Sequence, residues 1–236
     1  MSSETARLQM PLLQPAQAQK HVTVNEALMR LDASVNLVIQ SVSQVIPPLA
    51  VLDGQCWSVP AQAEGAWAGQ GGRLAIGSNG GWVFLPPRAG MRAFVADRGL
   101  PAIHDGTDWV VGGLSLSVSG AGMMAGMAEE DVAITTGKQI TTQLFIPSGA
   151  MVIGAVARVT SALSGTLTSW RMGTAGATNR FGQGLGKAEG SFARGMLGSP
   201  MTYYAPEPLL LTAEGGDFAT GRVRVSVHWW ELRLPR

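Results

Sequence analysis

Apolar residues in the segment from Thr23 to Pro48 recur at spacings that alternate between four and three. This repeat is typical of a coiled-coil seam, and it is narrower than the stripe of a helix that lies on a globular core. Thr23 and Glu26 have the spacing of a capping box, and Pro47 with Pro48 ends a helix sterically. The pattern predicts a coiled-coil helix over residues 23–46. Its seam is predicted to consist of Val24, Leu28, Leu31, Val35, Val38, Val42 and Val45.

The side chains of this seam indicate which partners the helix has. β-Branched residues occupy most of the seam positions, a composition that disfavours dimers and favours trimers or larger bundles. Valine is a poor helix former and a coiled coil this short is marginal alone, so other chains must add stability. The pattern therefore predicts a homotrimer. The alternative is that the helix packs on the β module of its own chain.

After the two prolines, helical periodicity gives way to turns and short strands. Turns rich in Gly, Asp and Pro separate apolar runs such as "RLAIG", "WVFLP" and "RAFVA". Such runs predict a small antiparallel β module over residues 49–112. Trp57, Trp67, Trp82 and Trp109 are expected to form its core, with surface stacking on sugars as the alternative. Cys56, beside Trp57, is expected to be a small, partly buried apolar residue.

The remaining chain divides into a linker and a second β domain. Residues 113–130 are rich in Gly, Ser and Met without strand-length alternation, which predicts a linker. At least six apolar runs separated by turns follow in residues 131–236, and they predict a C-terminal β-sandwich or jelly roll. Alternation from Val223 onward changes phase near Trp229, which indicates a β-bulge there. Residues 1–22, before the helix, are predicted to be an anchoring arm.

Composition excludes several classes of protein. Charged residues make up 14% of the chain, with 17 Lys and Arg against 16 Asp and Glu, so no nucleic-acid-binding surface is expected. The single cysteine excludes an intramolecular disulfide and fits folding in a reducing compartment. The N-terminus lacks the pattern of a secretory signal, and no apolar run is long enough for membrane insertion. With so few charges, part of the surface is expected to be covered by another chain.

Motifs for catalysis are missing from the sequence. The three histidines lie in separate segments, and neither HExxH nor GxSxG occurs, so we predict no catalytic residue, no metal site and no cofactor. The turn "HDGTDW" lacks the EF-hand pattern and is expected to be a simple Asp-Gly turn. A glycosidase needs only two carboxylates, and this alternative stays open. Its candidates in the distal domain are Glu129, Glu130, Asp131, Glu189, Glu207, Glu214, Asp217 and Glu231.

A long glycine-rich segment between strands of the distal domain is a candidate binding loop. Such loops at the end of a rigid sandwich commonly present binding residues. Aromatic rings and hydrogen-bond donors occur together in and around this segment, and sugars are bound by that pairing. The alternative is that the aromatics belong to the core and the arginines are solvated. The candidate carbohydrate-binding residues are Trp170, Arg171, Asn179, Arg180, Tyr203 and Tyr204.

The sequence "PLLQPAQAQKHVTVNEAL", followed by "LDASV", "GAWAG" and "GGW", resembles a domain of unknown function found in tail and fibre genes of alphaproteobacterial prophages and gene transfer agents. The resemblance covers about the first 110 residues. It implies a fibre or head spike on the surface of a phage-like particle, assembled in the bacterial cytoplasm. The residues that carry it best are Gln17, Gln19, Lys20, His21, Asn25, Glu26 and Leu31.

These observations together predict a fibrous homotrimer on the surface of a virion or phage-like particle. Its N-terminus is expected to attach to another particle protein, and its distal domain to bind capsule polysaccharide of the host cell. One alternative is a structural adaptor that docks another virion fibre protein. The other alternative is a glycosidase that degrades the capsule.

Overall fold

A computed structural model of the chain describes residues 3–13 and 20–236, with side chains in the second range from residue 22 onward. Strands dominate this structure, which confirms the prediction of a mainly β fold. Several residues of the resemblance, Gln17, Gln19 and the side chains of Lys20 and His21, lie outside the described residues. Within the described ranges, no helix is long and apolar enough to cross a membrane.

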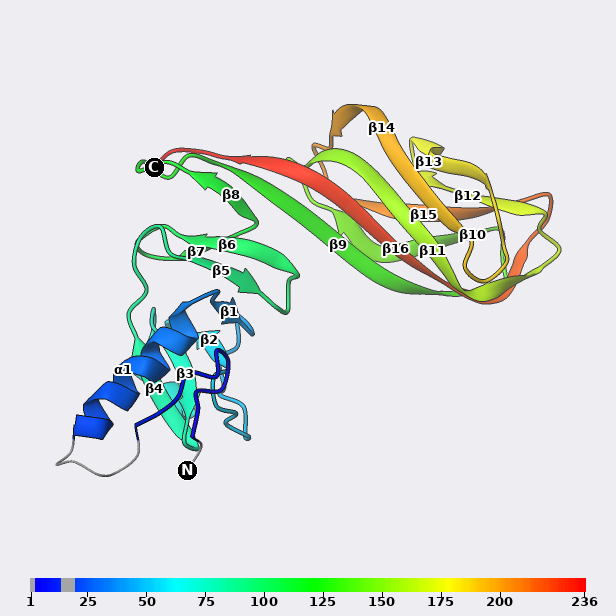
Figure 1. Cartoon of the computed structure of the whole chain (residues 1–236). Helices are drawn as coiled ribbons and strands as arrows, with labels where there is room; N and C mark the ends of the chain where they lie inside the picture. The colour runs from blue at the N-terminus through cyan, green and yellow to red at the C-terminus, as the bar shows by residue number, and fades with distance from the viewer. Residues whose placement is uncertain (1–2, 14–19) are drawn as a thin grey trace. The chain divides into compact units, whose positions relative to one another are not determined.

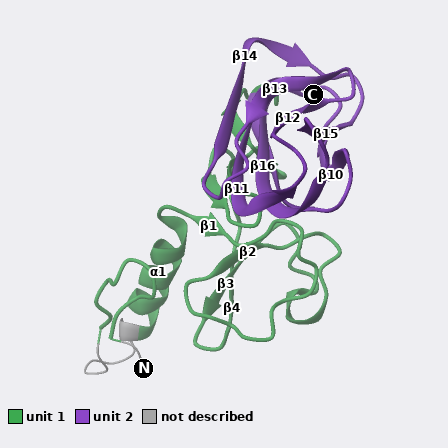
Figure 2. Ribbon diagram, turned by 90° about the vertical axis from the view of Figure 1, so that its right-hand side faces the viewer, with its two compact units in different colours: residues 1–122, 234–236 green, residues 123–233 purple. Residues whose placement is uncertain are grey.

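The chain forms two compact units (Figures 1 and 2). Unit 1 comprises Met1–Gly122 and Leu234–Arg236, and unit 2 comprises Met123–Arg233. Unit 1 contains the helix α1, a single 3-10 turn η1 and a sheet with the strand order β4-β3-β2-β1-β5-β6-β7. Its elements are α1 (Lys20–Ser34), β1 (Val38–Ile39), β2 (Cys56–Ser58), η1 (Gly65–Trp67), β3 (Leu74–Ser78), β4 (Gly81–Leu85), β5 (Arg92–Val95), β6 (Leu100–His104), β7 (Trp109–Val111) and β8 (Gly113–Leu116).

The helix differs from the predicted coiled coil at both ends. It begins at Lys20, so Thr23 lies inside it, and it ends at Ser34 instead of near Val45. Asn36 adopts a left-handed conformation with a φ of 47°, which terminates a helix. Val38 then lies in β1, which pairs in parallel with both β2 and β5. The predicted seven-residue seam is therefore wrong as one helical surface, and the predicted antiparallel module is a mixed sheet.

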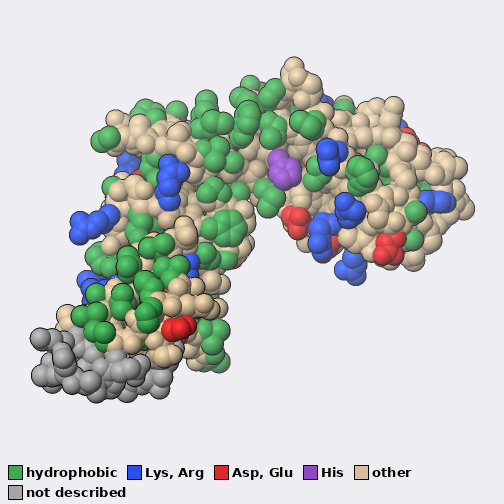
Figure 3. Space-filling model, in the orientation of Figure 1, with side chains coloured by type: hydrophobic (Ala, Val, Ile, Leu, Met, Phe, Trp, Pro, Cys, Tyr) green, Lys and Arg blue, Asp and Glu red, His purple; other side chains and the backbone are tan. Residues whose placement is uncertain are grey.

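Helix α1 packs on its own unit, which was the alternative to the coiled coil. Ala33 at its end joins Leu37 and Ile39 in a cluster with apolar residues of β2, β3 and β5. Ala33 was not a predicted seam residue, and two residues of α1 that were, Val24 and Leu31, are exposed. Figure 3 shows hydrophobic side chains on this part of the surface of unit 1. Only one end of the helix is thus covered by the core of unit 1.

An N-terminal arm, residues 3–13, packs against α1 through one buried carboxylate. Asp32 accepts hydrogen bonds from the Thr5 hydroxyl at 2.7 Å and from the backbone N–H groups of Arg7 at 3.1 Å and Leu8 at 2.6 Å. The Arg7 guanidinium donates to the carbonyl oxygens of Asp32 and Ala33, which are exposed acceptors at the end of the helix. The arm therefore caps the helix within one chain.

Tryptophans form the second core cluster of unit 1, as predicted. The rings of Trp57, Trp67 and Trp82 lie with centroids 5.2 to 5.9 Å apart, and Trp67 is fully buried. Tilted and edge-to-face contacts of this kind add to the free energy gained by burial. Trp109 instead packs edge-to-face on the buried ring of His104. Trp57 and Trp67 cannot stack on sugars, because their rings are inside the unit.

Cys56 is fully buried in β2, and burial raises the pKa of its thiol to about 12. Because the thiolate is the reactive form, the native thiol should resist alkylation. We expect iodoacetamide at pH 8 to leave the folded protein unmodified and to label Cys56 completely in denaturant, as measured by intact mass. Rapid labelling of the folded chain would contradict the buried position of β2.

Unit 2 is a β-sandwich, as predicted. One sheet has the order β10-β15-β12-β13, and the other places β14, β11, β16 and β9 side by side (Figure 1). A single apolar core draws residues from both sheets, among them Met172 and Leu211 from the first and Val225 and Val227 from the second. The strands are β9 (Gly122–Ile134), β10 (Gln139–Ile146), β11 (Met151–Gly165), β12 (Ser169–Thr174), β13 (Ala177–Leu185), β14 (Phe192–Thr202), β15 (Glu207–Glu214) and β16 (Phe218–Arg233).

The predicted linker over residues 113–130 is wrong, because β8 and most of β9 occupy it. The small residues of this segment reflect close packing. A Cβ on Gly126 of β9 would lie 2.2 Å from the indole of Trp229 on β16, so only glycine fits there. The expected irregularity near Trp229 is present, but its extra residue, Ile153, lies on the paired strand β11. Glycine content therefore marked a tight strand contact here, not a flexible connection.

Candidate functional site

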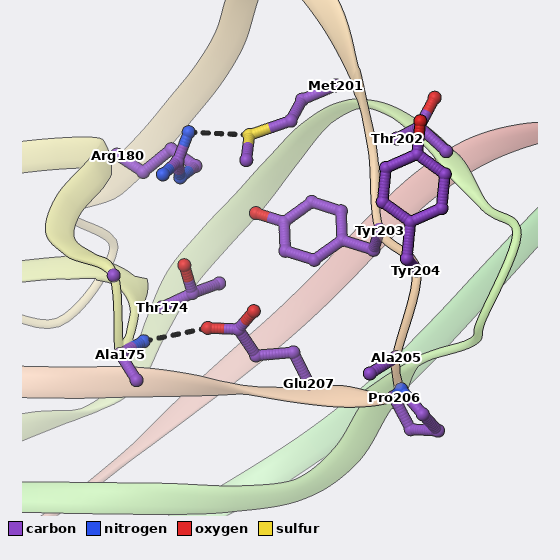
Figure 4. A pocket seen from close by; sticks show the side chains of 11 residues that line it. Thr174, Ala175, Arg180, Met201, Thr202, Tyr203, Tyr204, Ala205, Pro206 and Glu207 are labelled. Carbon is purple, nitrogen blue, oxygen red and sulfur yellow. Dashed lines mark hydrogen bonds between the residues drawn. The ribbon is translucent and has the colours of Figure 1, made fainter.

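A cavity of about 480 Å³ opens in unit 2 where the β12–β13 hairpin meets the segment between β14 and β15 (Figure 4). We call it the Tyr203 pocket. Its walls combine aromatic rings, one cation and one carboxylate on a scaffold of paired strands. The lining residues are Thr174, Ala175, Gly176, Arg180, Met201, Thr202, Tyr203, Tyr204, Ala205, Pro206 and Glu207.

Backbone pairing holds the segment that carries both tyrosines. The N–H of Tyr203 donates to the carbonyl of Ala150 at 2.9 Å, and the carbonyl of Tyr203 accepts from Gly149 at 2.7 Å. The Ser148 hydroxyl donates to the carbonyl of Tyr204 at 2.9 Å. These hydrogen bonds hold the segment against the start of β11, so the side chains of Tyr203 and Tyr204 point in different, fixed directions.

The two tyrosines have opposite environments. Tyr203 is 4% exposed, and its hydroxyl forms no hydrogen bond of ordinary geometry with any described residue. Burial raises the pKa of this phenol, although Thr174 and Arg180 act in the opposite direction. Tyr204 is 87% exposed and offers its ring to solvent. The pocket therefore has a buried donor and an accessible aromatic face.

Arg180 of β13 is partly buried, and its N–H groups have few and weak hydrogen-bond acceptors. Its Nη1 donates to the thioether sulfur of Met201 at 2.7 Å, and its buried Nε has no partner among the described residues. A thioether is a weak acceptor. Across the described parts of the chain, no carboxylate comes within ion-pair distance of this guanidinium. The cation is thus available to a ligand.

Glu207, at the start of β15, supplies the acceptor of the pocket. One of its carboxylate oxygens accepts the N–H of Ala175 at 2.9 Å, which ties β15 to the hairpin turn (Figure 4). In that view Arg180 lies on one side and Glu207 on the other, with Thr174 and the hydroxyl of Tyr203 between them. The pocket is therefore polarised, with a cation at one end and an anion at the other.

Three of the six predicted carbohydrate-binding residues, Arg180, Tyr203 and Tyr204, meet at this pocket, and three do not. Trp170 is 1% exposed and belongs to the core, where its indole N–H donates to the carbonyl of Gly186 at 2.9 Å. Its predicted role as a sugar platform is corrected by this burial.

Arg171 and Asn179 do not line the pocket. Arg171 follows Trp170 on β12, and its buried Nε finds no partner among the described residues. Asn179 is exposed on β13 and donates to the side chain of Gln183 at 3.0 Å. The sequence did not identify Thr174 and Met201 as pocket residues. The turn-forming pair Ala175-Gly176 was the one sequence signal that a hairpin turn lies next to Thr174.

Several of the other acidic residues weighed for catalysis have structural partners. Asp131 pairs with Arg224 at 2.7 Å, and the pKa of its carboxyl is lowered mainly by this hydrogen bond. Glu129 accepts a hydrogen bond from the Ser226 hydroxyl at 2.8 Å. Figure 3 shows acidic and basic side chains next to one another on the surface of unit 2. Glu207 is the one carboxylate among the described residues that line the Tyr203 pocket.

The remaining titratable clusters do not form a metal site. Asp105 accepts the N–H groups of Thr107 and Asp108 through one carboxylate oxygen, as expected for a simple turn. No group of three or more His, Cys, Asp or Glu side chains in residues 3–13 and 22–236 could hold a metal ion.

Comparisons with known proteins cover the two units differently. A family described as "Protein of unknown function (DUF2793)" matches residues 24–110, which lie in unit 1. This agrees with the expectation of a domain of unknown function in the first part of the chain. No curated protein matches the chain. Among solved structures, a chain of the cyanophage Pam1 capsid asymmetric unit is similar over 47% of this chain and 84% of that chain, with 22% identity and a TM-score of 0.31.

Proposed function

We propose that this chain is a surface protein of a phage-like particle and that unit 2 binds host-cell polysaccharide in the Tyr203 pocket. The observation that carries this proposal is that an exposed ring, Tyr204, and a poorly satisfied donor, Arg180, line the same cavity. A pyranose ring has an apolar face that stacks on aromatic side chains and hydroxyl groups that need polar partners. The cavity volume falls within the range typical of small-ligand sites.

Multivalent display would suit a site that binds one sugar unit weakly. The exposed apolar residues Val24 and Leu31 of α1, and Val35 just after it, support contact with other copies of the chain, and we retain the homotrimer as part of the proposal. Three linked sites raise avidity well above the affinity of one. Attachment through the N-terminal part to another particle protein, suggested by the resemblance of the first 110 residues, completes this hypothesis.

A structural adaptor is the second candidate, and one observation favours it. Strand β14 lies at the edge of its sheet and exposes Phe192 and Met196. Exposed apolar side chains on an edge strand are typical of a surface that docks another protein. The two candidates predict different consequences for Tyr204 and Phe192, which permits a direct test.

We expect Tyr204→Ala to weaken binding of the purified full chain to host capsule polysaccharide by about tenfold, equivalent to about 1.4 kcal/mol of lost stacking. Binding can be measured by biolayer interferometry on immobilised polysaccharide. Phe192→Ala is the matched control, because it also removes one exposed ring from unit 2 and should leave binding unchanged. Equal binding by Tyr204→Ala and wild type would contradict the proposal. Loss of particle assembly in Phe192→Ala alone would favour the adaptor.

A further inference from the structure

The positive charge of Arg180 indicates which chemical group of a ligand it would bind. Its guanidinium is partly buried, has no ion pair among the described residues and donates one N–H to the thioether sulfur of Met201. Removing a cation from water without a counter-charge is costly, and guanidinium groups pair well with planar carboxylates. A ligand carboxylate would replace the weak thioether contact with charge-assisted hydrogen bonds.

Tyr203 provides an independent observation at the same end of the pocket. Its buried hydroxyl has no hydrogen bond of ordinary geometry among the described residues, although the Thr174 hydroxyl lies close enough to lower its pKa. An acceptor supplied by a ligand would therefore satisfy it. Because burial raises the pKa of this phenol, it stays protonated near neutral pH and can donate its O–H to an acceptor on a ligand. In Figure 4 the hydroxyl points to the side of the pocket that Arg180 and Thr174 occupy. Two donors therefore lack an acceptor in one place.

Glu207 restricts how an anionic ligand can lie. Its carboxylate is oriented by the N–H of Ala175 and lies on the opposite side of Thr174 from Arg180. A ligand carboxylate near Glu207 would be repelled, whereas ligand hydroxyls there could donate to it. The pocket thus favours a ligand with an anionic group at one end and hydroxyl groups at the other.

From this arrangement we infer that the Tyr203 pocket recognises a hexuronate unit of an acidic polysaccharide. The carboxylate of the sugar pairs with Arg180 and accepts from Tyr203, and its ring hydroxyls donate to Glu207. A hexuronate carries these groups on opposite sides of one ring, which a neutral hexose does not. This inference rests on the proposed function of the same pocket.

Matched sugar pairs test the inference with the full chain. Oligomers of galacturonate, glucuronate and mannuronate are compared by calorimetry with the oligomers of galactose, glucose and mannose, which differ at carbon 6. We expect at least one acidic member to bind about tenfold or more tightly than its neutral partner, and the difference to shrink as salt rises. Arg180→Gln should remove the preference, and Arg180→Lys should retain part of it. Arg194→Gln, the same charge change on an exposed residue of β14, should leave it intact.

The outcomes separate the two hypotheses. Equal binding of an acidic oligomer and its neutral partner would overturn the hexuronate inference and leave polysaccharide binding standing. A preference that survives in Arg180→Gln would overturn it as well. If no oligomer of either kind binds at about 10 mM, both the inference and the proposed function fail. Unchanged thermal unfolding of each variant shows that losses arise in the pocket and not from misfolding.

Discussion

Replacing Gly195 with alanine is expected to destabilise unit 2 more than any other single methyl addition to β14. An added Cβ would lie 2.1 Å from the carbonyl oxygen of Phe181 and 2.6 Å from its Cα. These are backbone atoms of β13, in the opposite sheet, and they cannot turn away as a side chain can. We expect a loss of about 3 kcal/mol or more, because the two sheets must separate where they meet.

The consequence of Gly195→Ala extends to the Tyr203 pocket, because Phe181 follows Arg180 on β13. A shift of this strand would move the guanidinium as well. A loss of that size should lower the melting temperature of unit 2 by about 10 °C or more, followed by near-ultraviolet circular dichroism. Sugar binding should fall even at temperatures where the variant remains folded.

Gly198→Ala is the matched control on the same strand. Nothing lies within 4 Å of a Cβ built on Gly198, so the added methyl meets only solvent. Its effect should stay within about 0.5 kcal/mol, as for an ordinary surface substitution. If both variants melt with the wild type, the close approach of β13 and β14 is wrong.

Asp32→Asn is expected to release the N-terminal arm from unit 1. Asp32 is 1% exposed and accepts three hydrogen bonds from residues of the arm. The amide of asparagine keeps the shape but replaces one acceptor oxygen with a donor, which then faces donors. Buried groups left unpaired cost about 1–3 kcal/mol each, so we expect a loss of about 2–4 kcal/mol.

Hydrogen exchange can detect this release directly. The backbone N–H groups of Arg7 and Leu8 should lose protection in Asp32→Asn, and unit 1 should melt earlier than in wild type. Glu26→Gln is the control, because it removes a carboxylate from the same helix whose pair with Arg30 is exposed. Such exposed pairs contribute only about 0.3–0.5 kcal/mol. Protection that persists in Asp32→Asn would show that other contacts hold the arm.

The two units differ in how far local pattern predicts them. Alternating runs such as the one beginning at Val223 predict strands, because one face of such a strand is buried along the whole run. The strands of unit 2 form where these runs predict them. In the segment around Val38, the same valines fit both a helical seam and a strand. Val38 is in a strand because its segment pairs with β2 and β5, which lie far along the chain. Spacing of side chains carries no information about such distant partners.

The candidate site shows the same division. Residue types near the glycine-rich segment indicated a place where rings and donors occur together, and Arg180, Tyr203 and Tyr204 do line one pocket. Spacing could not distinguish Trp170, whose indole turns inward to the carbonyl of Gly186, from Tyr204, whose ring stays in solvent. In the sequence analysis Glu207 was one of eight candidate carboxylates for a glycosidase, and its position in the pocket with Arg180 depends on how β15 meets the hairpin.

The order of amino acids alone was sufficient for the mainly β character, the aromatic core around Trp67 and the sandwich at the C-terminal end. These features follow from short-range periodicity and from burial of apolar groups, which act within a few residues. The end of α1 at Ser34, the burial of Asp32 under the arm and the assembly of the Tyr203 pocket emerged only from the folded chain. Each depends on hydrogen bonds or contacts between segments distant in sequence, whose free energy no local pattern records.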